Sequence, residues 1–293
     1  REAVVGYQRL LGDDADVTIA TQNGLMIALQ SQGKNQEALE WARRIVDSHR
    51  GRGGTDTPSF ASNLGNLGET LEQLGYYEEA LPRLREAYAI LQRHYGEGSV
   101  HVHITRLNIA HVLILMHQHQ EALALLNAEI PPSLEGYSVS TERARRLVLL
   151  GDCYADMGRA DEARRYYDEG EAFVVANFKP DNVFAVFANG YIDWGRARLL
   201  LQEERYREAL PKLRNLLERF RSAGSSNINY QATVLRLQME LAQTLVALHQ
   251  AAEATELVKS SSEAIGKLAP THPAYQNLQR LQAQLGAGAR GGE

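Results

Sequence analysis

An alanine recurs along this chain at intervals of 41 to 46 residues, each time five residues after a position where a helix is predicted to turn back. Small and bulky apolar residues lie around it at spacings of three and four, with polar residues between them. That spacing is the buried stripe of an amphipathic helix. Each period holds two such stripes divided by a short break, which predicts a helical hairpin. The recurring residues are Ala38, Ala80, Ala122, Ala163, Ala209 and Ala254.

The break between the two stripes has a composition of its own. Three of its six central positions are glycine, the residue that ends a helix most readily in a left-handed conformation. The alanine that follows is expected where two helices cross closely, because a larger side chain would force them apart. The six central positions are Gly33, Gly75, His117, Gly158, Glu204 and His249.

A fixed period of this length predicts a solenoid of stacked hairpins in which each unit contacts mainly its neighbours. No segment alternates apolar and polar residues over more than a few positions, so no strand is predicted. We expect one all-α, right-handed superhelical solenoid over 1–285. Its segments are a partial repeat at 1–12, hairpins at 13–50, 58–94, 100–130, 138–178, 181–221 and 227–267, a capping helix at 270–285, and a disordered tail at 286–293.

The second of these hairpins resembles the tetratricopeptide repeat (TPR). The period is longer than the usual length of about 34 residues, and it is similar to the long-repeat subclass of kinesin light chains and bacterial signalling proteins. The resemblance weakens near 204, where Arg196 stands at an expected leucine. The residues that carry it are Leu64-Gly65-Asn66-Leu67-Gly68, Leu71, Gly75, Tyr77 and Glu79-Ala80-Leu81, with linker-like Tyr95-Gly96-Glu97-Gly98-Ser99 and Thr271-His272-Pro273.

Composition narrows the function classes. The net charge of −5 is spread along the 293 residues, whereas a nucleic-acid binder needs a concentrated basic surface. No apolar stretch reaches the roughly 18 residues of a membrane span. Cys153 is the only cysteine, so no internal disulfide can form, which is compatible with the cytoplasm. The start at Arg1 indicates a region of a longer protein, and the bias toward arginine, alanine and leucine favours a bacterial source.

The resemblance implies that the first helix of each hairpin lines a concave binding surface. At family contact positions this chain has Glu69, Asp152 and Arg198. The lysine and asparagine set with which some TPR proteins clamp a peptide C-terminus is missing.

The spacing of Tyr191, Trp194 and Arg198 places an aromatic pair and a guanidinium on one helix face, with Arg236 and Met239 expected beside them. Tyr, Trp and Arg dominate binding hot spots. The alternative is that Trp194 packs between hairpins.

Two further clusters receive a structural interpretation. The polar run Asn66, Glu69, Glu72 and Gln73 is interpreted as a solvated helix face. Six histidines lie within 26 residues, but we predict no metal site. On one helix spanning 101–117, residues two apart diverge by about 200 degrees, and the ends lie roughly 24 Å apart. Surface and turn histidines are the preferred interpretation. The six are His94, His101, His103, His111, His117 and His119.

The sequence therefore predicts a non-catalytic scaffold that binds a protein or peptide partner, with no cofactor, nucleic acid or membrane involved. It fits an interaction region of a larger bacterial signalling or regulatory protein. The alternative is a sensor that binds a small peptide or metabolite in the groove and signals to another domain, which an enclosed cavity would favour. An enzyme is the weakest candidate, because no phosphate loop, nucleophile elbow or kinase signature is present.

Overall fold

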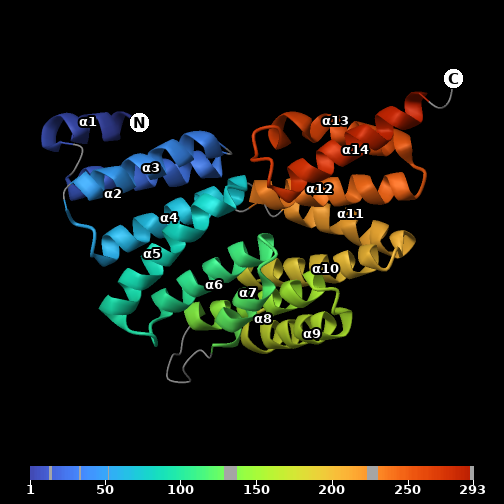
Figure 1. Ribbon diagram of the computed structural model, residues 1–293, viewed down its shortest axis with the longest axis horizontal. Helices are drawn as coiled ribbons and strands as arrows, with labels where there is room; N and C mark the ends of the chain where they lie inside the picture. The colour runs from blue at the N-terminus through green and yellow to red at the C-terminus, as the bar shows by residue number, and fades with distance from the viewer. Residues whose placement is uncertain (13–14, 33, 52, 129–136, 223–229, 291–293) are drawn as a thin grey trace.

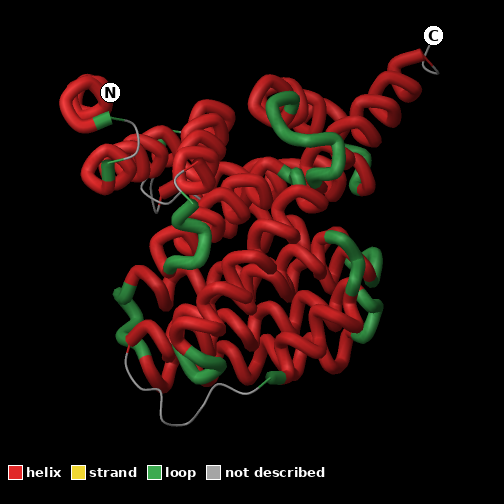
Figure 2. The backbone as a smooth tube through the Cα atoms, turned by 60° about the vertical axis from the view of Figure 1, so that its left-hand side comes forward, coloured by secondary structure: helices red, strands yellow, loops and turns green. Residues whose placement is uncertain are grey.

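The computed structural model describes the chain except for residues 13–14, 33, 52, 129–136, 223–229 and 291–293 (Figure 1). The described residues form fourteen helices and no strand, as Figure 2 shows. The helices are α1 (Glu2–Leu11), α2 (Asp16–Ser31), α3 (Asn35–Gly51), α4 (Pro58–Leu74), α5 (Tyr77–Tyr95), α6 (Val100–Leu115), α7 (His119–Asn127), α8 (Tyr137–Asp156), α9 (Ala160–Asn177), α10 (Val183–Gln202), α11 (Tyr206–Ser222), α12 (Tyr230–Ala247), α13 (Ala251–Ile265) and α14 (Pro273–Arg290).

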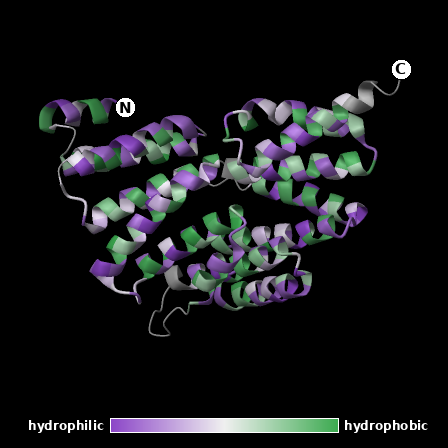
Figure 3. Ribbon diagram, in the orientation of Figure 1, coloured by the Kyte–Doolittle hydropathy of each residue, from purple (hydrophilic) through white to green (hydrophobic). Residues whose placement is uncertain are grey.

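The helices pair into hairpins from α2–α3 to α12–α13, with α1 before them and α14 after them. Successive hairpins stack in chain order, so the all-α solenoid expected from the sequence is confirmed. Both hydrophilic and hydrophobic residues occur along nearly every helix in Figure 3. Most helices bury one stripe and expose another, whereas α6, in the middle of the stack, is buried on nearly all sides.

The hairpin turns are built as the sequence predicts. Five of the six central positions have positive φ, between 57° and 89°, and the sixth, Gly33, lies outside the described residues. At Gly75 the backbone N–H donates to the Glu72 carbonyl at 2.9 Å, and the next N–H donates to the Leu71 carbonyl at 2.8 Å. This pair of hydrogen bonds closes a helix end in a left-handed turn. Histidine or glutamate at three of these positions carries a conformational cost that glycine avoids.

All six recurring alanines are fully buried, with 0% of their surface exposed. The glycines of the first helices show why the crossings need small residues. A Cβ added to Gly68 would lie 2.6 Å from Leu84 Cδ2 on the partner helix. Gly151 and Gly195 make the same close approach to the ring of Tyr167, which is fully buried.

The stack also closes on itself, which the sequence did not predict. The segment 266–272, between α13 and α14, lies against the end of α4. Ala269 N–H donates to the Leu74 carbonyl at 2.7 Å, and Thr271 Oγ1 donates to the Gly75 carbonyl. One apolar cluster accordingly runs from Met26 in α2 to Leu281 in α14. The first and last thirds of the chain thus join, as their meeting near α4 and α12 in Figure 1 indicates.

Exposed arginines on the second helices pair with carboxylates one hairpin further along. Arg43 reaches Glu79 at 2.8 Å, and Arg214 reaches Glu253 at 2.7 Å. Such exposed pairs each contribute little to stability. They do neutralise these arginines, whose charges would otherwise form a basic surface.

Two local expectations need correction. Arg196, at a position where leucine is expected, turns outward and pairs with Asp168 and Glu171. The predicted disordered tail is helical through Arg290, because α14 continues past 285, and 291–293 lie outside the described residues. Among the described helices none is both long and apolar enough to span a membrane.

Candidate ligand-binding site

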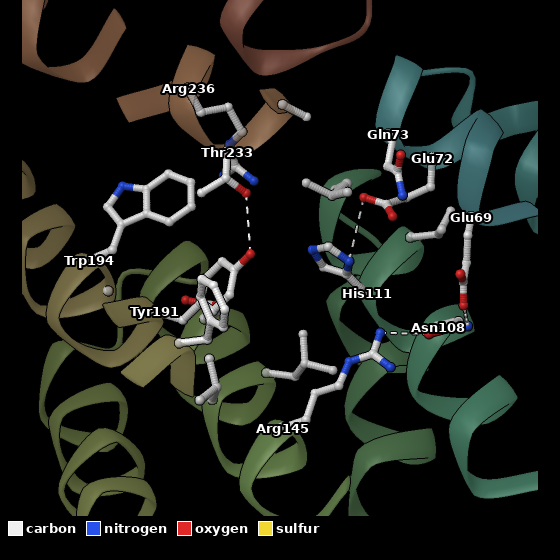
Figure 4. Close-up of a pocket in the computed structure, with 18 of the residues that line it drawn as sticks. Glu69, Glu72, Gln73, Asn108, His111, Arg145, Tyr191, Trp194, Thr233 and Arg236 are labelled. Atoms are coloured by element: carbon white, nitrogen blue, oxygen red, sulfur yellow. Dashed lines mark hydrogen bonds and ion pairs between the residues drawn. The ribbon is translucent and has the colours of Figure 1, made fainter. Parts of the chain in front are cut away.

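The closed solenoid surrounds a pocket of about 510 Å³ (Figure 4). The first helices α4, α6, α8, α10 and α12 line most of it, with Tyr77 and Leu84 of α5 and His272 of the closing segment. Its volume falls in the range of small-ligand pockets, roughly 300–1,000 Å³. Unlike most such pockets, it contains many charged and polar side chains.

The α4 side of the pocket is acidic. Glu72 is only 20% exposed, and burial raises its pKa to about 7, with the nearby Glu69 carboxylate acting in the same direction. Near neutral pH a large fraction of Glu72 is therefore protonated. The interpretation of this patch as a solvated helix face is wrong for Glu72 and Gln73, which are largely buried, whereas Asn66 and Glu69 are partly exposed.

His111 stands beside Glu72, with His111 Nδ1 3.6 Å from Glu72 Oε1. Burial lowers the pKa of His111 to about 3, and the positive charges of Arg145, Arg236 and Arg198 add to the effect. The imidazole is thus neutral at physiological pH, and its contact with Glu72 is not an ion pair.

An amide links the acidic side to α8. Asn108 Nδ2 donates to Glu69 Oε1 at 2.6 Å, and Arg145 donates to Asn108 Oδ1 at 2.6 Å. Arg145 also lies 3.7 Å from a carboxylate oxygen of Glu142. Both the Glu69 carboxylate and the Arg145 guanidinium therefore have partners within the protein.

Arg198, on α10, is surrounded by three carboxylates at 3.7 to 3.9 Å, those of Asp152, Asp156 and Glu240. Burial opposes its charge, but Asp152 and Glu240 outweigh that effect and raise the Arg198 pKa. Asp152 in turn accepts a hydrogen bond of 2.8 Å from the Tyr167 hydroxyl. The positive charge of Arg198 is therefore balanced by carboxylates of the protein itself.

The opposite side is aromatic and basic. Trp194 is 5% exposed, and its indole N–H donates to Glu240 Oε2 at 2.5 Å. The Arg236 guanidinium stacks 4.7 Å above the indole ring. Arg236 Nε is buried and makes no hydrogen bond with any described residue. Next to this pair, the Tyr191 hydroxyl lies 3.3 Å from Thr233 Oγ1 (Figure 4).

The structure brings six of the seven candidate residues to this pocket: Glu69, Asp152, Tyr191, Trp194, Arg198 and Arg236. Met239 is the exception. It is fully buried in the apolar cluster, together with Ala242 and Leu278, because that side of α12 faces α14. Trp194 combines both interpretations, since it packs in the core and presents one ring face to the pocket.

Sequence reasoning did not select several residues of the pocket. Glu72, Arg145 and Thr233 each lie three or seven residues from a selected residue on the same helix face, so helical spacing could have identified them. His272 had no such signal, because only ring closure brings it here.

Comparison with known proteins agrees with this architecture. Family models described as tetratricopeptide repeat match residues 53–130 and 144–170. No curated protein matches the sequence.

Three solved structures share the fold. BtubC (BKLC) from P. vanneervenii is 21% identical with a TM-score of 0.55, over 62% of this chain and 73% of its own. A Rap protein complexed with Competence and Sporulation Factor is 16% identical with a TM-score of 0.58, over 93% and 77%. A tetratricopeptide repeat protein from Parabacteroides merdae is 15% identical with a TM-score of 0.54, over 96% and 90%.

The family matches cover two separate stretches, and the same hairpin geometry continues through the rest of the described helices. Repeats of this kind serve in general as protein-interaction scaffolds. The chain thus contains tetratricopeptide repeats, which the family models match over 53–130 and 144–170.

Proposed function

We propose that this protein is a non-catalytic receptor for a short acidic peptide segment, which it binds in the central pocket. The observation that carries the proposal is Arg236. Its guanidinium is held over Trp194 in the wall of the pocket, and its buried Nε has no acceptor among the described residues. A buried donor without an acceptor is costly, and a ligand carboxylate would supply that acceptor.

The other charges of the pocket restrict where a negatively charged ligand group can bind. Arg198 and Arg145 already have carboxylate neighbours, so Arg236 is the cation best placed to receive a ligand anion. A carboxylate can bind a guanidinium through two parallel hydrogen bonds. Tyr191 lines the pocket next to Arg236 and offers apolar surface for an apolar or aromatic side chain on the same ligand.

The side chains of the pocket suit binding better than catalysis. Burial, with three nearby arginines acting in the same direction, keeps the pKa of His111 too low for it to be an effective base near pH 7. Cys153 lies in the apolar core and not in the pocket lining, and burial raises its thiol pKa to about 11. A thiol held in that state is a poor nucleophile.

The Rap structure shares this fold and contains a bound factor. At 16% identity it supports the proposal only through the architecture. The predictions of a bacterial, cytoplasmic and signalling protein rest on the sequence.

A sensor role is the second candidate, and one observation favours it. His272 both lines the pocket and packs against Gly75, where the closing segment meets α4. A ligand that contacts His272 would therefore shift the equilibrium toward the closed form. The size of the shift equals the difference in the ligand's binding free energy for the closed and open forms.

The test uses calorimetric titration with acetylated, amidated hexapeptides that carry one phenylalanine and one glutamate in varied order. Matched peptides carry glutamine in place of glutamate. We expect some glutamate peptides to bind, and Arg236→Met to weaken them at least tenfold, since hydrogen bonds to charged groups contribute about 1.5–3 kcal/mol. Arg280→Met, at an exposed position outside the pocket, is the control.

Trp194 fluorescence reports occupancy of the pocket in a Trp41→Phe background, because the chain has two tryptophans. The proposal fails if no peptide binds at millimolar concentration, or if glutamine peptides bind as well as glutamate ones. Equal affinity in Arg236→Met and the parent protein would place the site elsewhere.

A further inference from the structure

Two histidines and an aspartate converge outside the pocket, at the turn between α6 and α7. Helix α6 ends at Leu115, His117 occupies the left-handed turn with φ 58°, and His119 is the first residue of α7. The sequence argument against a metal placed 117 and 119 on helical backbone, where the side chains would diverge. That premise is wrong for this pair, because the chain reverses between them. Their rings lie 5.8 Å apart between centroids.

Both imidazoles point at one carboxylate, that of Asp156 at the end of α8. His117 Nδ1 and His119 Nε2 each lie 2.8 Å from Asp156 Oδ2. The three potential ligand atoms all lie within 4.8 Å of one another. Tetrahedral ligands at about 2.0–2.2 Å from a zinc ion are separated by roughly 3.3–3.6 Å, so small movements of the three side chains would admit an ion between them.

The surroundings hold the carboxylate in this direction. The second oxygen, Asp156 Oδ1, lies 3.9 Å from the Arg198 guanidinium, which leaves Oδ2 for the imidazoles. Metal-ligating carboxylates are commonly held by such outer partners. His119 and Asp156 are 19% and 20% exposed, whereas His117 is 75% exposed. Two ligands are thus fixed by packing, and the third stands on the solvent side, where an ion and its waters can enter.

We propose that His117, His119 and Asp156 bind one divalent transition-metal ion of the zinc class. Imidazole nitrogens suit zinc, nickel and copper, whereas magnesium and calcium prefer an all-oxygen set. Water completes the coordination. The ion ties the α6–α7 turn to the end of α8, so its effect is to stabilise the contact between two consecutive hairpins. This proposal is independent of the peptide site.

The matched control comes from the repeat itself. His249 occupies the corresponding turn position, with φ 61°, and belongs to no metal-binding cluster found among the described residues. Asparagine tolerates a left-handed conformation better than most residues, so His117→Asn and His249→Asn perturb the backbone equally. Asp156→Asn removes the shared carboxylate and leaves both histidines in place.

The experiment titrates zinc chloride into the untagged full chain, with stoichiometry from calorimetry and Tm from differential scanning calorimetry. We expect one site with Kd of 10 μM or tighter and a saturable rise in Tm, while magnesium chloride has no effect. His117→Asn and Asp156→Asn should each weaken zinc binding at least tenfold, and His249→Asn should bind as the parent does.

Absence of saturable binding overturns the proposal and leaves the cluster as two hydrogen bonds that join neighbouring hairpins. Binding that survives both His117→Asn and Asp156→Asn also overturns it, since the ion then lies at other residues. If Asp156→Asn fails to fold, His117→Asn decides the matter, because its exposed side chain can be replaced without disturbing the core.

Discussion

The α4–α5 and α10–α11 hairpins stand on opposite sides of the pocket, and they follow the repeat pattern to different degrees. The first has glycine at its turn, and its first helix contributes the acidic side. The second has Glu204 at its turn and Arg196 at an expected leucine, and its first helix contributes Tyr191, Trp194 and Arg198. The aromatic side of the pocket thus comes from the hairpin that departs from the repeat pattern. The acidic side comes from a hairpin that follows the pattern.

The difference shows that a repeat can carry a binding surface in two ways. In α4 the carboxylates Glu69 and Glu72 lie beside the stripe of buried apolar residues and are not part of it. In α10 the residues of the site belong partly to the core, since Trp194 and Gly195 are buried. In the second hairpin the site residues also contribute to core packing, whereas in the first the pocket residue Glu72 affects stability through the burial of its charge.

The largest expected effects test whether the two hairpins share one crossing geometry. Ala80→Leu in α5 and Ala209→Leu in α11 should each lower the free energy of unfolding by about 2–3 kcal/mol, because overpacking a closely packed core forces strain. Urea denaturation measures both. A loss in Ala80→Leu alone would show that the α10–α11 crossing is looser than its buried alanine indicates.

The turns should respond in opposite directions. Gly75→Ala should destabilise by about 2 kcal/mol, since a left-handed alanine is strained and its Cβ would lie 2.6 Å from His272 Cβ. Glu204→Gly should stabilise by about 1 kcal/mol by relieving a φ of 57°. Thermal unfolding of both variants is the measurement, and a stabilising Gly75→Ala would contradict the closed ring.

Glu72 tests the cost of a buried charge on the acidic side of the pocket. The pKa of Glu72 is higher in the folded than in the unfolded protein, so its stabilising contribution is complete below about pH 4.5 and is lost as pH rises through about 7. Glu72→Gln should therefore raise the free energy of unfolding by about 1–2 kcal/mol at pH 8 and leave it nearly unchanged at pH 4.

The control for that comparison is Glu78→Gln, an exposed position on α5. His111 and His272 have low pKa values, so they titrate at a more acidic pH than Glu72. Both histidines are present in the parent and in the variant. The difference in free energy of unfolding between the two proteins therefore reports on Glu72. An equal gain at both pH values would mean that Glu72 is not the titrating group.

The smallest effect concerns backbone freedom in α4. A Cβ added to Gly65 meets no atom within 4 Å, so Gly65→Ala should stabilise by about 0.5–1 kcal/mol through helix propensity. Gly195→Ala in α10 should destabilise instead, because Tyr167 occupies that space. Guanidinium denaturation of the pair shows whether the two helices differ as the contacts indicate.

The sequence predicted what depends on neighbours along the chain. Periodicity located the buried alanines and the left-handed turns, because each hairpin repeats the same local contacts. It also selected Trp194 and Arg236, which share a pocket. Ring closure was not predictable, since the meeting of Leu74 with Ala269 depends on rotation accumulated over several hairpins.

Everything that ring closure determines was missed for the same reason. Glu72 appeared solvated because its cover comes from the far end of the chain, and His272 appeared to be only part of a linker. The convergence of His117 and His119 was missed for a local reason. Two residues that straddle a left-handed turn point in directions that helical spacing does not describe.

The contact between 266–272 and α4 also changes how this solenoid should unfold. A linear array of hairpins loses its terminal units first, because each end has a neighbour on one side only. Here α13 and α14 are held by residues almost 200 positions earlier in the chain. The ring should therefore behave as one cooperative unit with slow hydrogen exchange throughout. Helix α1, which begins the chain before the closure and exposes Leu10 and Leu11, should fray first.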